Sequence, residues 1–262
     1  MSDGTVNAQT HGPVGHLIFD NPARHNAVSL AMWESAARIL REFRDSAAIR
    51  VVVLSGAGGK AFVSGADISK FDSERAETEA VAHYNATTQR VYEAIESLPK
   101  PTIAMIDGYC LGGGLNLALA CDVRLCSAKS RFGLPAARLG LGYPDASLKR
   151  LIDAVGPGHA KDIAFSARQF GADEALAIDL VQRVVADGEL GAAVEAYSAE
   201  IAANAPLTLK AMKLTVAELL KDAQARNLAL CQRLVADCFA SEDYREGRRA
   251  FLEKRKPRFQ GC

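Results

Sequence analysis

The sequence has no excess of either charge, no paired cysteine motif and no long apolar run. Lys and Arg together number 31, as do Asp and Glu, so the formal net charge is zero. A neutral chain lacks the general field that favours nucleic acid or an anionic membrane surface, so an anionic ligand must be met by local charges. No stretch approaches the roughly 20 apolar residues that span a bilayer, and the polar start does not resemble a signal peptide. We expect no nucleic-acid or membrane partner.

The six cysteines and five histidines are not arranged for metal or disulfide chemistry. No C-x-x-C pair occurs, and most of the cysteines stand in apolar surroundings, where thiols behave as small hydrophobic groups. This usage is typical of a reducing compartment, so we expect a cytoplasmic protein. No two histidines have the spacing of a metal-binding pair, so no metal site is expected.

The chain has enough apolar sequence for one large domain, since 49% of its 262 residues are hydrophobic. We expect a disordered tail over residues 1–10, an α/β core over 11–200 and a helical region over 201–262. Ser29 is suited to cap a helix that continues to about Arg44. The predicted strands cover residues 16–20, 50–55, 102–107, 122–126 and 180–185. The other predicted helices cover residues 77–97, a stretch ending at 120, and residues 207–220, 227–240 and 241–254. Apolar strands alternating with helices predict largely parallel sheets covered by helices.

The predicted helix at 227–240 is unusually apolar. A helix with apolar residues on so much of its surface needs cover on more than one side. Either its own subunit or another subunit could supply that cover.

Two turns that contain glycine are the strongest candidates for a site. The first lies in KAFVSGADI at 60–68, where Gly65 leads into Asp67, and the second is GYCLGGGLN at 108–116. Glycine lets the backbone approach a ligand closely, and a helix that starts there points unpaired N–H donors at it. Two such turns brought together could give two donors to one oxyanion. Each turn could equally be a structural element of a strand–helix connection.

A nucleotide site is the alternative of a different class, because dinucleotide sites also begin with glycines between a strand and a helix. The third glycine of that fingerprint is replaced by Leu117, and no acidic residue follows at the required strand end. The stretch GAGGK at 56–60 is not a phosphate-binding loop of the Walker type, since Ala61 follows the lysine.

The motifs resemble those of the enoyl-CoA hydratase/isomerase (crotonase) family. AFVSGADI at 61–68 is similar to the family motif A-F-x-x-G-A-D-[IL], and KPTIAMIDGYCLGGG at 100–114 with Cys121-Asp122 is similar to the second motif. The similarity extends from about His16 to Phe259. The resemblance implies a crotonase-like spiral of ββα units with a helical C-terminal trimerisation region, and therefore a homotrimer or a dimer of trimers.

The resemblance also implies the parts of the site. Ala66 and Gly113 would be the two oxyanion donors, and the substrate would be an acyl-CoA thioester, whose CoA moiety replaces any prosthetic group. The residues implied to line the CoA path are Arg24, His25, Ala27, Ser64, Ala66, Asp67, Ile68, Leu111 and Phe259. The segment 66–68 would curl around the adenine, and the basic residues 254–258 would lie near the phosphates unless they form a solvated charge run.

The sequence departs from the family at the two glutamates that activate water in the hydratases. Those positions hold Asn116 and Ala136, and neither side chain can carry out general acid–base work. Asn116 would instead orient the acyl group. Losing a general acid–base group such as a catalytic glutamate typically lowers the rate by about two to four orders of magnitude, so hydration by the usual mechanism is doubtful.

Other groups near the expected acyl pocket could move protons. Isomerases and dehalogenases of the family carry a carboxylate at the position of Pro144, so a shift of one residue would bring Asp145 into that role. Asp145 could equally cap the helix that starts near Ala146. Tyr143 matches a tyrosine of family decarboxylases, although these carry histidine in place of Ala66. The remaining alternative is an acyl-CoA binder without catalytic activity.

Overall fold

The computed structural model describes residues 4–67 and 78–262. Its strands are β1 (Thr5–His11), β2 (Val14–Asp20), β3 (Val51–Gly56), β4 (Ala61–Val63), β5 (Thr102–Ile106), β6 (Tyr109–Leu111), β7 (Val123–Ser127), β8 (Arg131–Gly133), β9 (Gln169–Gly171) and β10 (Arg183–Val185). Its α-helices are α1 (Leu30–Asp45), α3 (Thr78–Glu96), α4 (Gly113–Ala120), α5 (Asp145–Ser166), α6 (Ala172–Ala177), α7 (Leu190–Ala202), α8 (Pro206–Leu219), α9 (Leu228–Ala240) and α10 (Glu242–Leu252).

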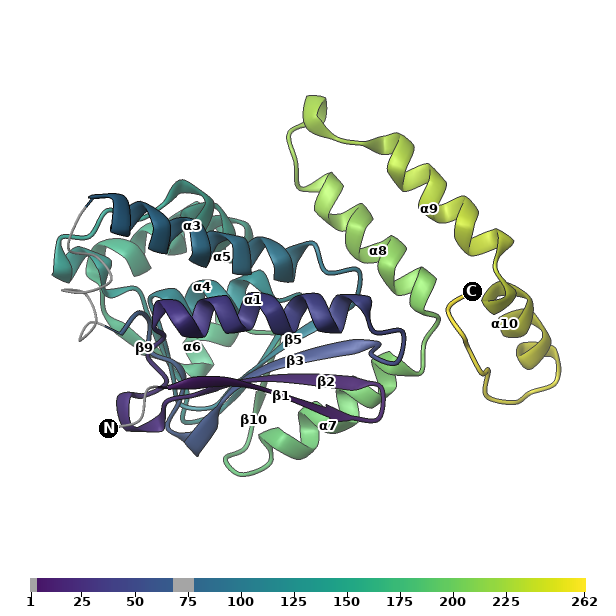
Figure 1. Ribbon diagram of the computed structural model, residues 1–262, viewed down its shortest axis with the longest axis horizontal. Helices are drawn as coiled ribbons and strands as arrows, with labels where there is room; N and C mark the ends of the chain where they lie inside the picture. Colours follow the sequence, from purple (N-terminus) through teal and green to yellow (C-terminus); the bar gives the residue numbers. More distant parts are fainter. Residues whose placement is uncertain (1–3, 68–77) are drawn as a thin grey trace.

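Two sheets arise from a repeated strand–strand–helix unit. The larger has the order β1-β2-β3-β5-β7-β10 and the smaller the order β4-β6-β8-β9. The successive pairs β3–β4, β5–β6 and β7–β8 each give one strand to each sheet and precede α3, α4 and α5. Pairing within the larger sheet is parallel from β2 onward. The predicted α/β class with largely parallel sheets is therefore confirmed, with the helices α1, α3, α4 and α5 on one side of the larger sheet and α7 on the other (Figure 1).

The N-terminal segment corrects the prediction of a disordered tail. Residues 5–11 form β1, which pairs antiparallel with β2 from Thr5 opposite Asp20 to His11 opposite Val14. Val6 is the one buried residue of this strand. Main-chain hydrogen bonds to the edge of the sheet therefore stabilise a segment whose polar side chains give no apolar signal.

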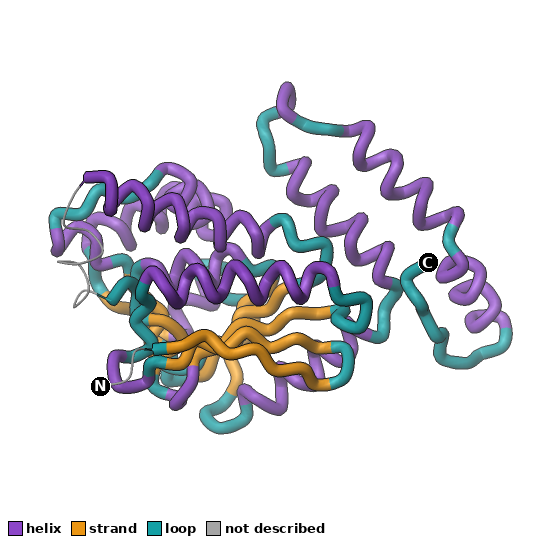
Figure 2. Tube along the Cα trace, in the orientation of Figure 1, coloured by secondary structure: helices purple, strands orange, loops and turns teal. Residues whose placement is uncertain are grey.

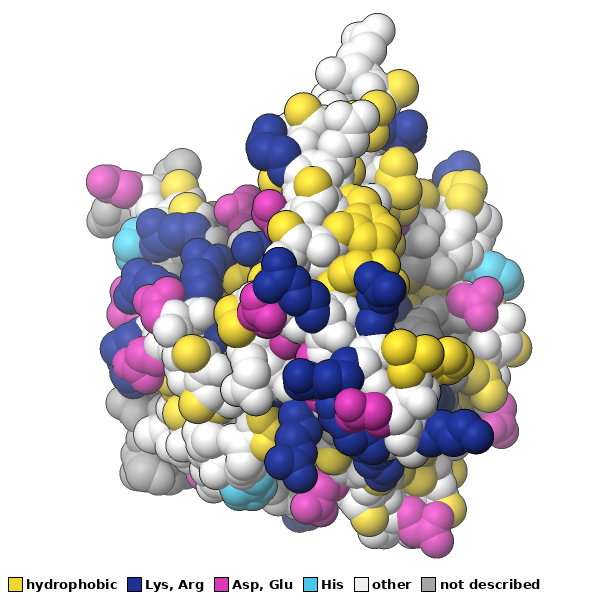
Figure 3. All heavy atoms as spheres, turned by 90° about the vertical axis from the view of Figure 1, so that its right-hand side faces the viewer, with side chains coloured by type: hydrophobic (Ala, Val, Ile, Leu, Met, Phe, Trp, Pro, Cys, Tyr) yellow, Lys and Arg dark blue, Asp and Glu magenta, His cyan; other side chains and the backbone are white. Residues whose placement is uncertain are grey.

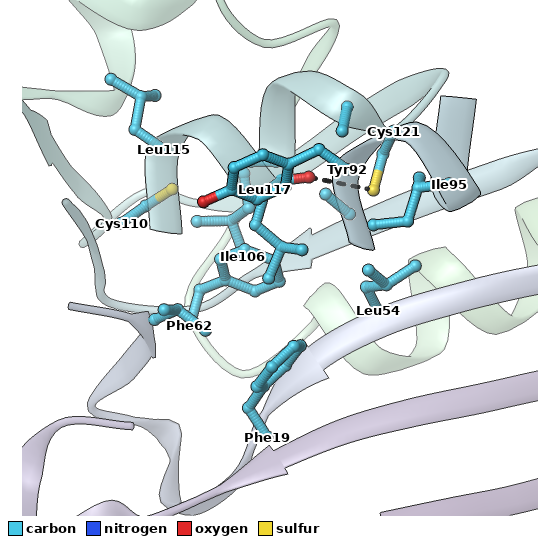
Figure 4. Packing of buried hydrophobic residues seen from close by; sticks show 14 of the residues in the cluster. Phe19, Leu54, Phe62, Tyr92, Ile95, Ile106, Cys110, Leu115, Leu117 and Cys121 are labelled. Carbon is cyan, nitrogen blue, oxygen red and sulfur yellow. Dashed lines mark hydrogen bonds between the residues drawn. The ribbon is translucent and has the colours of Figure 1, made fainter. Parts of the chain in front are cut away.

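A large core lies between the larger sheet and the helices α1, α3 and α4. Ser29 caps α1 by accepting a hydrogen bond from the Met32 N–H, as predicted. Trp33 of that helix is buried, and its indole N–H donates to the Tyr84 hydroxyl at 2.9 Å. Figure 4 shows side chains of the larger sheet and of α3 and α4 meeting in this core. On the other face of the sheet, α7 covers a smaller cluster that includes Val51 and Val53, whereas Val52 and Leu54 face the large core, which is why residues 51–54 of β3 are all apolar.

The predicted strand at 180–185 is shorter in the structure. The N–H groups of Leu180 and Val181 both donate to the carbonyl of Ala175, in the turn that ends α6. The strand β10 therefore begins only at Arg183. Both apolar residues are buried in that turn, so their hydrophobicity reflects burial and not strand pairing.

The helices α8, α9 and α10 extend away from the sheets (Figures 1 and 2). Lys213 attaches α8 to the core, because its ammonium pairs with Asp122 at 2.8 Å and donates to two backbone carbonyls. The apolar surface of α9 is largely uncovered in the single chain, with Phe239 62% exposed and Leu234 buried. None of the helices in the described residues is long and apolar enough to cross a membrane.

Candidate functional site

The two predicted glycine turns meet in space. A Cβ on Gly113 would lie 3.8 Å from the Gly65 Cα, and one on Gly65 would lie 3.7 Å from the Gly113 nitrogen. A Cβ on Gly114 would overlap the carbonyl oxygen of Val63 at 1.9 Å, so only glycine allows the start of α4 to lie against the end of β4. Gly65 itself has φ 113°, a backbone conformation that favours glycine. The glycines therefore bring both candidate donors to one place.

The N–H group of Ala66 points away from Val28, with which Ala66 forms a parallel bridge. Val28 bonds to the two residues on either side of Ala66: its N–H donates to the Gly65 carbonyl, and its carbonyl accepts from the Asp67 N–H at 3.0 Å. In such a parallel bridge the central residue points its own N–H to the opposite side. No acceptor for the Ala66 N–H occurs within residues 4–67 and 78–262.

Gly113 supplies the second free N–H. It is the first residue of α4, and the first N–H groups of a helix have no acceptor within the helix. The residue before it, Gly112, has φ 53° and ψ −113°, which turns the chain from β6 into the helix. Its N–H donates to the Gly133 carbonyl at 3.0 Å, which fixes the turn to β8. Two backbone donors thus lie at the contact between the turns, and the positive end of α4 adds to one of them.

The loop expected on the CoA path is held in an unusual conformation. His25 and Asn26 have φ values of 52° and 56°, in the left-handed region. The buried Asn26 side chain fixes the loop, because its Nδ2 donates to the carbonyls of Ala57 and Ala61 and its Oδ1 accepts from the Asn21 N–H. Asn26 falls within the range 24–27 implied to line the CoA path, but its role in holding the loop was not predicted, although asparagine is one of the few residue types that adopt this conformation readily.

Arg24 links this loop to the segment after Gly65. Its guanidinium contacts both carboxylate oxygens of Asp67, at 3.0 and 2.7 Å. Ser64 is bonded to the backbone of the same loop. Its N–H donates to the His25 carbonyl at 3.2 Å, and its hydroxyl donates to the Arg24 carbonyl. His25 is exposed, with its ring edge-on to Tyr109 at 5.7 Å between centroids. The structure therefore brings together most of the residues expected on the CoA path.

Ala27 and Leu111 belong to the same neighbourhood. Ala27 is buried and its N–H donates to the Arg24 carbonyl, while Leu111 ends β6 directly before the glycine run. Ile68 lies outside the described residues, as does the start of any helix after Asp67.

The two positions that depart from the family have different surroundings. Asn116 is 3% exposed, and its Nδ2 donates to the Tyr143 hydroxyl at 2.9 Å. The same hydroxyl lies 3.5 Å from the Gly112 carbonyl. Asn116 Oδ1 is buried and has no hydrogen-bond partner within residues 4–67 and 78–262. Ala136 is half-buried in a 3-10 turn and packs against the core, where its methyl group offers no proton chemistry.

Tyr143 stays protonated in this environment. Burial raises the pKa of Tyr143 above its usual range, although Arg150 acts in the opposite direction. The guanidinium of Arg150 pairs with Glu96 at 2.6 Å and lies over the Tyr92 ring at 5.1 Å. Tyr92 in turn donates to the Gly113 carbonyl at 3.0 Å. Sequence analysis missed Tyr92 and Arg150, because no local pattern relates residues so far apart in the chain.

Asp145 lies at the first position of α5 and is exposed. Its Oδ1 accepts a hydrogen bond from the Ala146 N–H at 2.8 Å. The N-cap of α5 is Pro144, so Asp145 does not cap the helix as predicted, although a carboxylate in the first turn is favoured by the positive end of the helix. The contact with its own helix favours a structural role of Asp145 over a proton-transfer role.

Phe259 is not brought to the other predicted residues within one chain. Its carbonyl accepts from the Arg50 guanidinium at 2.6 Å, and its ring lies against Gly247 of α10. Arg50 directly precedes β3 in the larger sheet, whereas the two glycine turns follow β4 and β6 of the smaller sheet. The physical reason is that α8–α10 carry the C-terminus away from the core (Figure 1).

In the basic tail, residues 254–258, the Arg255 side chain forms ion pairs with carboxylates of the same chain. Arg255 pairs with Glu246 and Glu253, and the Arg258 N–H donates to Glu246 at 3.0 Å. These contacts hold the pKa of Glu246 well below its usual range. Figure 3 shows Lys and Arg side chains gathered on the side of the molecule that carries α10. Within a single chain, the tail thus fits the solvated charge run better than a phosphate site.

The described residues contain no group of three His, Cys, Asp or Glu side chains that could hold a metal ion.

Comparison with known proteins identifies relatives along nearly the whole chain. A model of the enoyl-CoA hydratase/isomerase family matches residues 9–262. The chain is 33% identical to the short-chain-enoyl-CoA hydratase of Clostridium acetobutylicum, over 98% of this chain and 97% of that protein. It is 34% identical to the crotonyl-CoA hydratase of Syntrophomonas wolfei, over 93% of each. The crystal structure of an enoyl-CoA hydratase from Bacillus anthracis matches with a TM-score of 0.92 and 31% identity, covering 98% of this chain and 100% of that one.

Proposed function

The chain belongs to the enoyl-CoA hydratase/isomerase family and has its crotonase-like fold, and we propose that it stabilises a thioester enolate with the N–H groups of Ala66 and Gly113. The observation that carries the proposal is the meeting of the two glycine turns, at which neither amide has an acceptor within the described residues. An acyl-CoA thioester supplies the missing acceptor, because its carbonyl oxygen gains negative charge as the enolate forms.

Hydration through paired glutamates is not part of the proposal. Asn116 and Ala136 occupy the two positions, and neither side chain titrates in the useful range. The relatives named as hydratases therefore support the substrate class and not the reaction. The enolate must arise by a step that does not need this pair of acids.

Tyr143 is the proton donor that the surroundings support best. Its hydroxyl accepts from Asn116 and stays protonated because burial raises its pKa. The raised pKa makes this hydroxyl a weak acid, which gives up its proton only to a strong base such as an enolate carbon. In this role Tyr143 would serve isomerisation or the decarboxylation of a malonyl-type thioester. In decarboxylation the bond to the carboxylate breaks, its electron pair enters the enolate, and a proton then reaches the α-carbon. Asp145 is left out, because its carboxylate bonds to the start of its own helix.

The CoA moiety arrives with the substrate, so the proposed reaction needs no prosthetic group. Arg24, His25, Ala27, Ser64, Asp67 and Leu111 are proposed to line its path to the two donors. A binder without catalytic activity would use the same residues. It differs from the enzyme only in turnover.

Incubation with enoyl-, dienoyl- and malonyl-type CoA esters, followed by mass spectrometry, tests this function. Turnover of one class is expected, and binding of all classes without turnover would leave only the binder. Ala66→Pro deletes one donor and should lower the rate by about 100-fold or more. Ala66→Gly keeps the N–H and is the matched control. Equal rates for the two variants would refute the role of the Ala66 amide.

A further inference from the structure

Two buried tyrosines of α3 bond to the backbone next to the two proposed donors. Tyr84 and Tyr92 lie about two turns apart on one face of this helix, and each is 3% exposed. The Tyr84 hydroxyl donates to the Val28 carbonyl at 3.2 Å, and the Tyr92 hydroxyl donates to the Gly113 carbonyl at 3.0 Å. One helix is therefore bonded to the backbone on both sides of the proposed oxyanion site.

Tyr84 acts on Ala66 through Val28. The N–H of Val28 donates to the Gly65 carbonyl, and its carbonyl accepts from the Asp67 N–H, so Val28 holds the peptide groups on either side of Ala66. A carbonyl oxygen can accept two hydrogen bonds, and the Tyr84 hydroxyl takes the second position on the Val28 oxygen. The direction of the Ala66 N–H thus depends on a contact with α3.

Tyr92 acts on the residue that carries the second donor. Gly113 has no side chain to restrain it, and it lies at the start of α4, where helices fray. The hydrogen bond from Tyr92 to its carbonyl limits rotation of the Gly113 backbone, and therefore limits the directions that its N–H can take. The Tyr92 ring is itself held, because the Arg150 guanidinium lies over it at 5.1 Å and pairs with Glu96 at 2.6 Å.

Trp33 of α1 contacts both tyrosines. Its indole N–H donates to the Tyr84 hydroxyl at 2.9 Å, and its ring meets the Tyr92 ring edge-on, with 5.6 Å between the centroids. Tyr92 also lies among the apolar side chains of the core (Figure 4). Because such a core is close-packed, the three aromatic side chains cannot shift independently. The two hydroxyls are therefore fixed relative to each other as well as to the backbone.

We propose that Tyr84 and Tyr92 are positioning residues, which set the distance between the Ala66 and Gly113 N–H groups by anchoring both donor segments to α3. In this role neither hydroxyl touches the substrate or moves a proton. Donors stabilise an oxyanion when they are held within about 0.5 Å of the right place before the charge forms. The inference rests on the proposed function, since it requires both N–H groups to bind one oxygen.

The infrared carbonyl band of bound butyryl-CoA, isotope-labelled at the thioester carbonyl, tests the inference. Hydrogen bonds to the oxygen lower the frequency of this band, so binding to the original chain should shift it downward. Tyr84→Phe and Tyr92→Phe keep the rings and delete the hydroxyls, and each should reverse a measurable part of the shift. With the best substrate of the panel, kcat should fall by about tenfold, less than the loss expected for deleting a donor, while KM changes by less than about twofold.

Thr88→Val is the matched control. It removes from α3 a hydroxyl that donates within the helix, to the Tyr84 carbonyl at 2.9 Å, and it leaves both tyrosine hydroxyls in place. The carbonyl shift and kcat should therefore stay as in the original chain. Equal losses in Thr88→Val and in the tyrosine variants would overturn the inference, because they would show a general loosening of α3.

The other outcomes separate the inference from the proposed function. A full shift and an unchanged kcat in both tyrosine variants would overturn the inference and leave the two donors intact. No shift on the original chain would refute the proposed function, and the inference with it. Because Tyr84→Phe also takes the acceptor of the Trp33 indole, thermal melting checks its fold. If that variant unfolds, Tyr92→Phe decides alone, and a full shift there overturns the inference.

Discussion

Gly113 lies against Gly65, with only 3.8 Å between the Gly65 Cα and the position that a Cβ on Gly113 would take. This contact joins two turns that are separated by almost 50 residues and brings one free N–H from each to the same place. Both N–H groups belong to the backbone. They therefore persist whatever side chains the rest of the site carries, and the loss of acidic groups does not affect them.

Gly113→Pro should remove the second donor without breaking α4. Proline is tolerated at the first position of a helix, where its missing N–H has no acceptor in the helix. We expect turnover to fall by about 100-fold or more, measured as kcat/KM on the best substrate of the panel. Gly113→Ala keeps the N–H, and its Cβ would meet the Tyr92 hydroxyl at an ordinary 3.5 Å. Equal losses in the two variants would mean that crowding and not the N–H matters.

Asp145→Asn tests the structural role of the carboxylate in the first turn of α5. The asparagine keeps an oxygen for the Ala146 N–H but removes the negative charge from the start of α5. The free energy of unfolding should fall by about 0.3–1 kcal/mol, as measured by urea denaturation, while turnover stays within a few-fold. A rate loss of several hundred-fold with unchanged stability would assign the carboxylate to proton transfer.

Alkaline pH should destabilise the fold through its buried thiols. Burial raises the pKa of Cys121 and of Cys126 to about 12 each, and the nearby carboxylates of Asp122 and Asp173 act in the same direction. The unfolded pKa of a thiol is about 8.5, so the stability from these neutral thiols is complete below that pH and is lost as the pH rises toward 12.

Above the unfolded pKa and below the folded pKa of about 12, each of the two thiols should lower the free energy of unfolding by about 1.4 kcal/mol per pH unit. Urea unfolding under reducing conditions at pH 8, 9 and 10 measures the slope. Cys121 lies in the core shown in Figure 4, and Cys121→Ala should make the fall shallower. A stability that does not change between pH 8 and 10 would contradict burial of the thiols.

Lys213→Met should loosen the attachment of α8. The Lys213 side chain is 8% exposed, and its removal breaks the ion pair with Asp122 and the hydrogen bonds to the carbonyls of Ile95 and Lys100. Asp122 keeps its two hydrogen bonds from Thr102. Since Asp122 is partly exposed, we expect a loss of about 2 kcal/mol, below the range for fully buried pairs. Urea denaturation gives the loss, and faster proteolysis between α7 and α8 would show where it acts. Lys161→Met, an exposed position on α5, is the control and should change neither measurement.

The apolar surface of α8–α10 should be covered by further copies of the chain. Large apolar side chains are exposed there, namely Met212, Val216, Leu219, Leu220, Leu228, Val235, Phe239, Phe251 and Leu252. Many large apolar side chains exposed on neighbouring helices indicate an interaction site, and the family resemblance implies a homotrimer or a dimer of trimers. Light scattering should give three or six times the 27.9 kDa of one chain. Phe239→Asp should lower that mass, and a monomer at micromolar concentration would refute the assembly.

The local elements could be predicted because their causes are local. The Ser29 cap and the fully buried strand β3 follow from residues that are neighbours in the sequence. The strand β1 could not be predicted, because its stability comes from pairing with β2 and not from its own side chains. The bounds of β10 were wrong because burial in a turn and burial in a strand give the same apolar pattern.

By itself the sequence determined the family, the two glycine turns and the replacement of both glutamates, since motifs and residue identities are written in the chain. Only the tertiary structure decided that Asn116 contacts Tyr143, that Asp145 bonds to its own helix and that Phe259 lies away from the turns. These facts depend on where the chain returns after many residues and on which hydrogen bonds form there. No local pattern specifies such contacts, because they are fixed jointly by the packing of several elements.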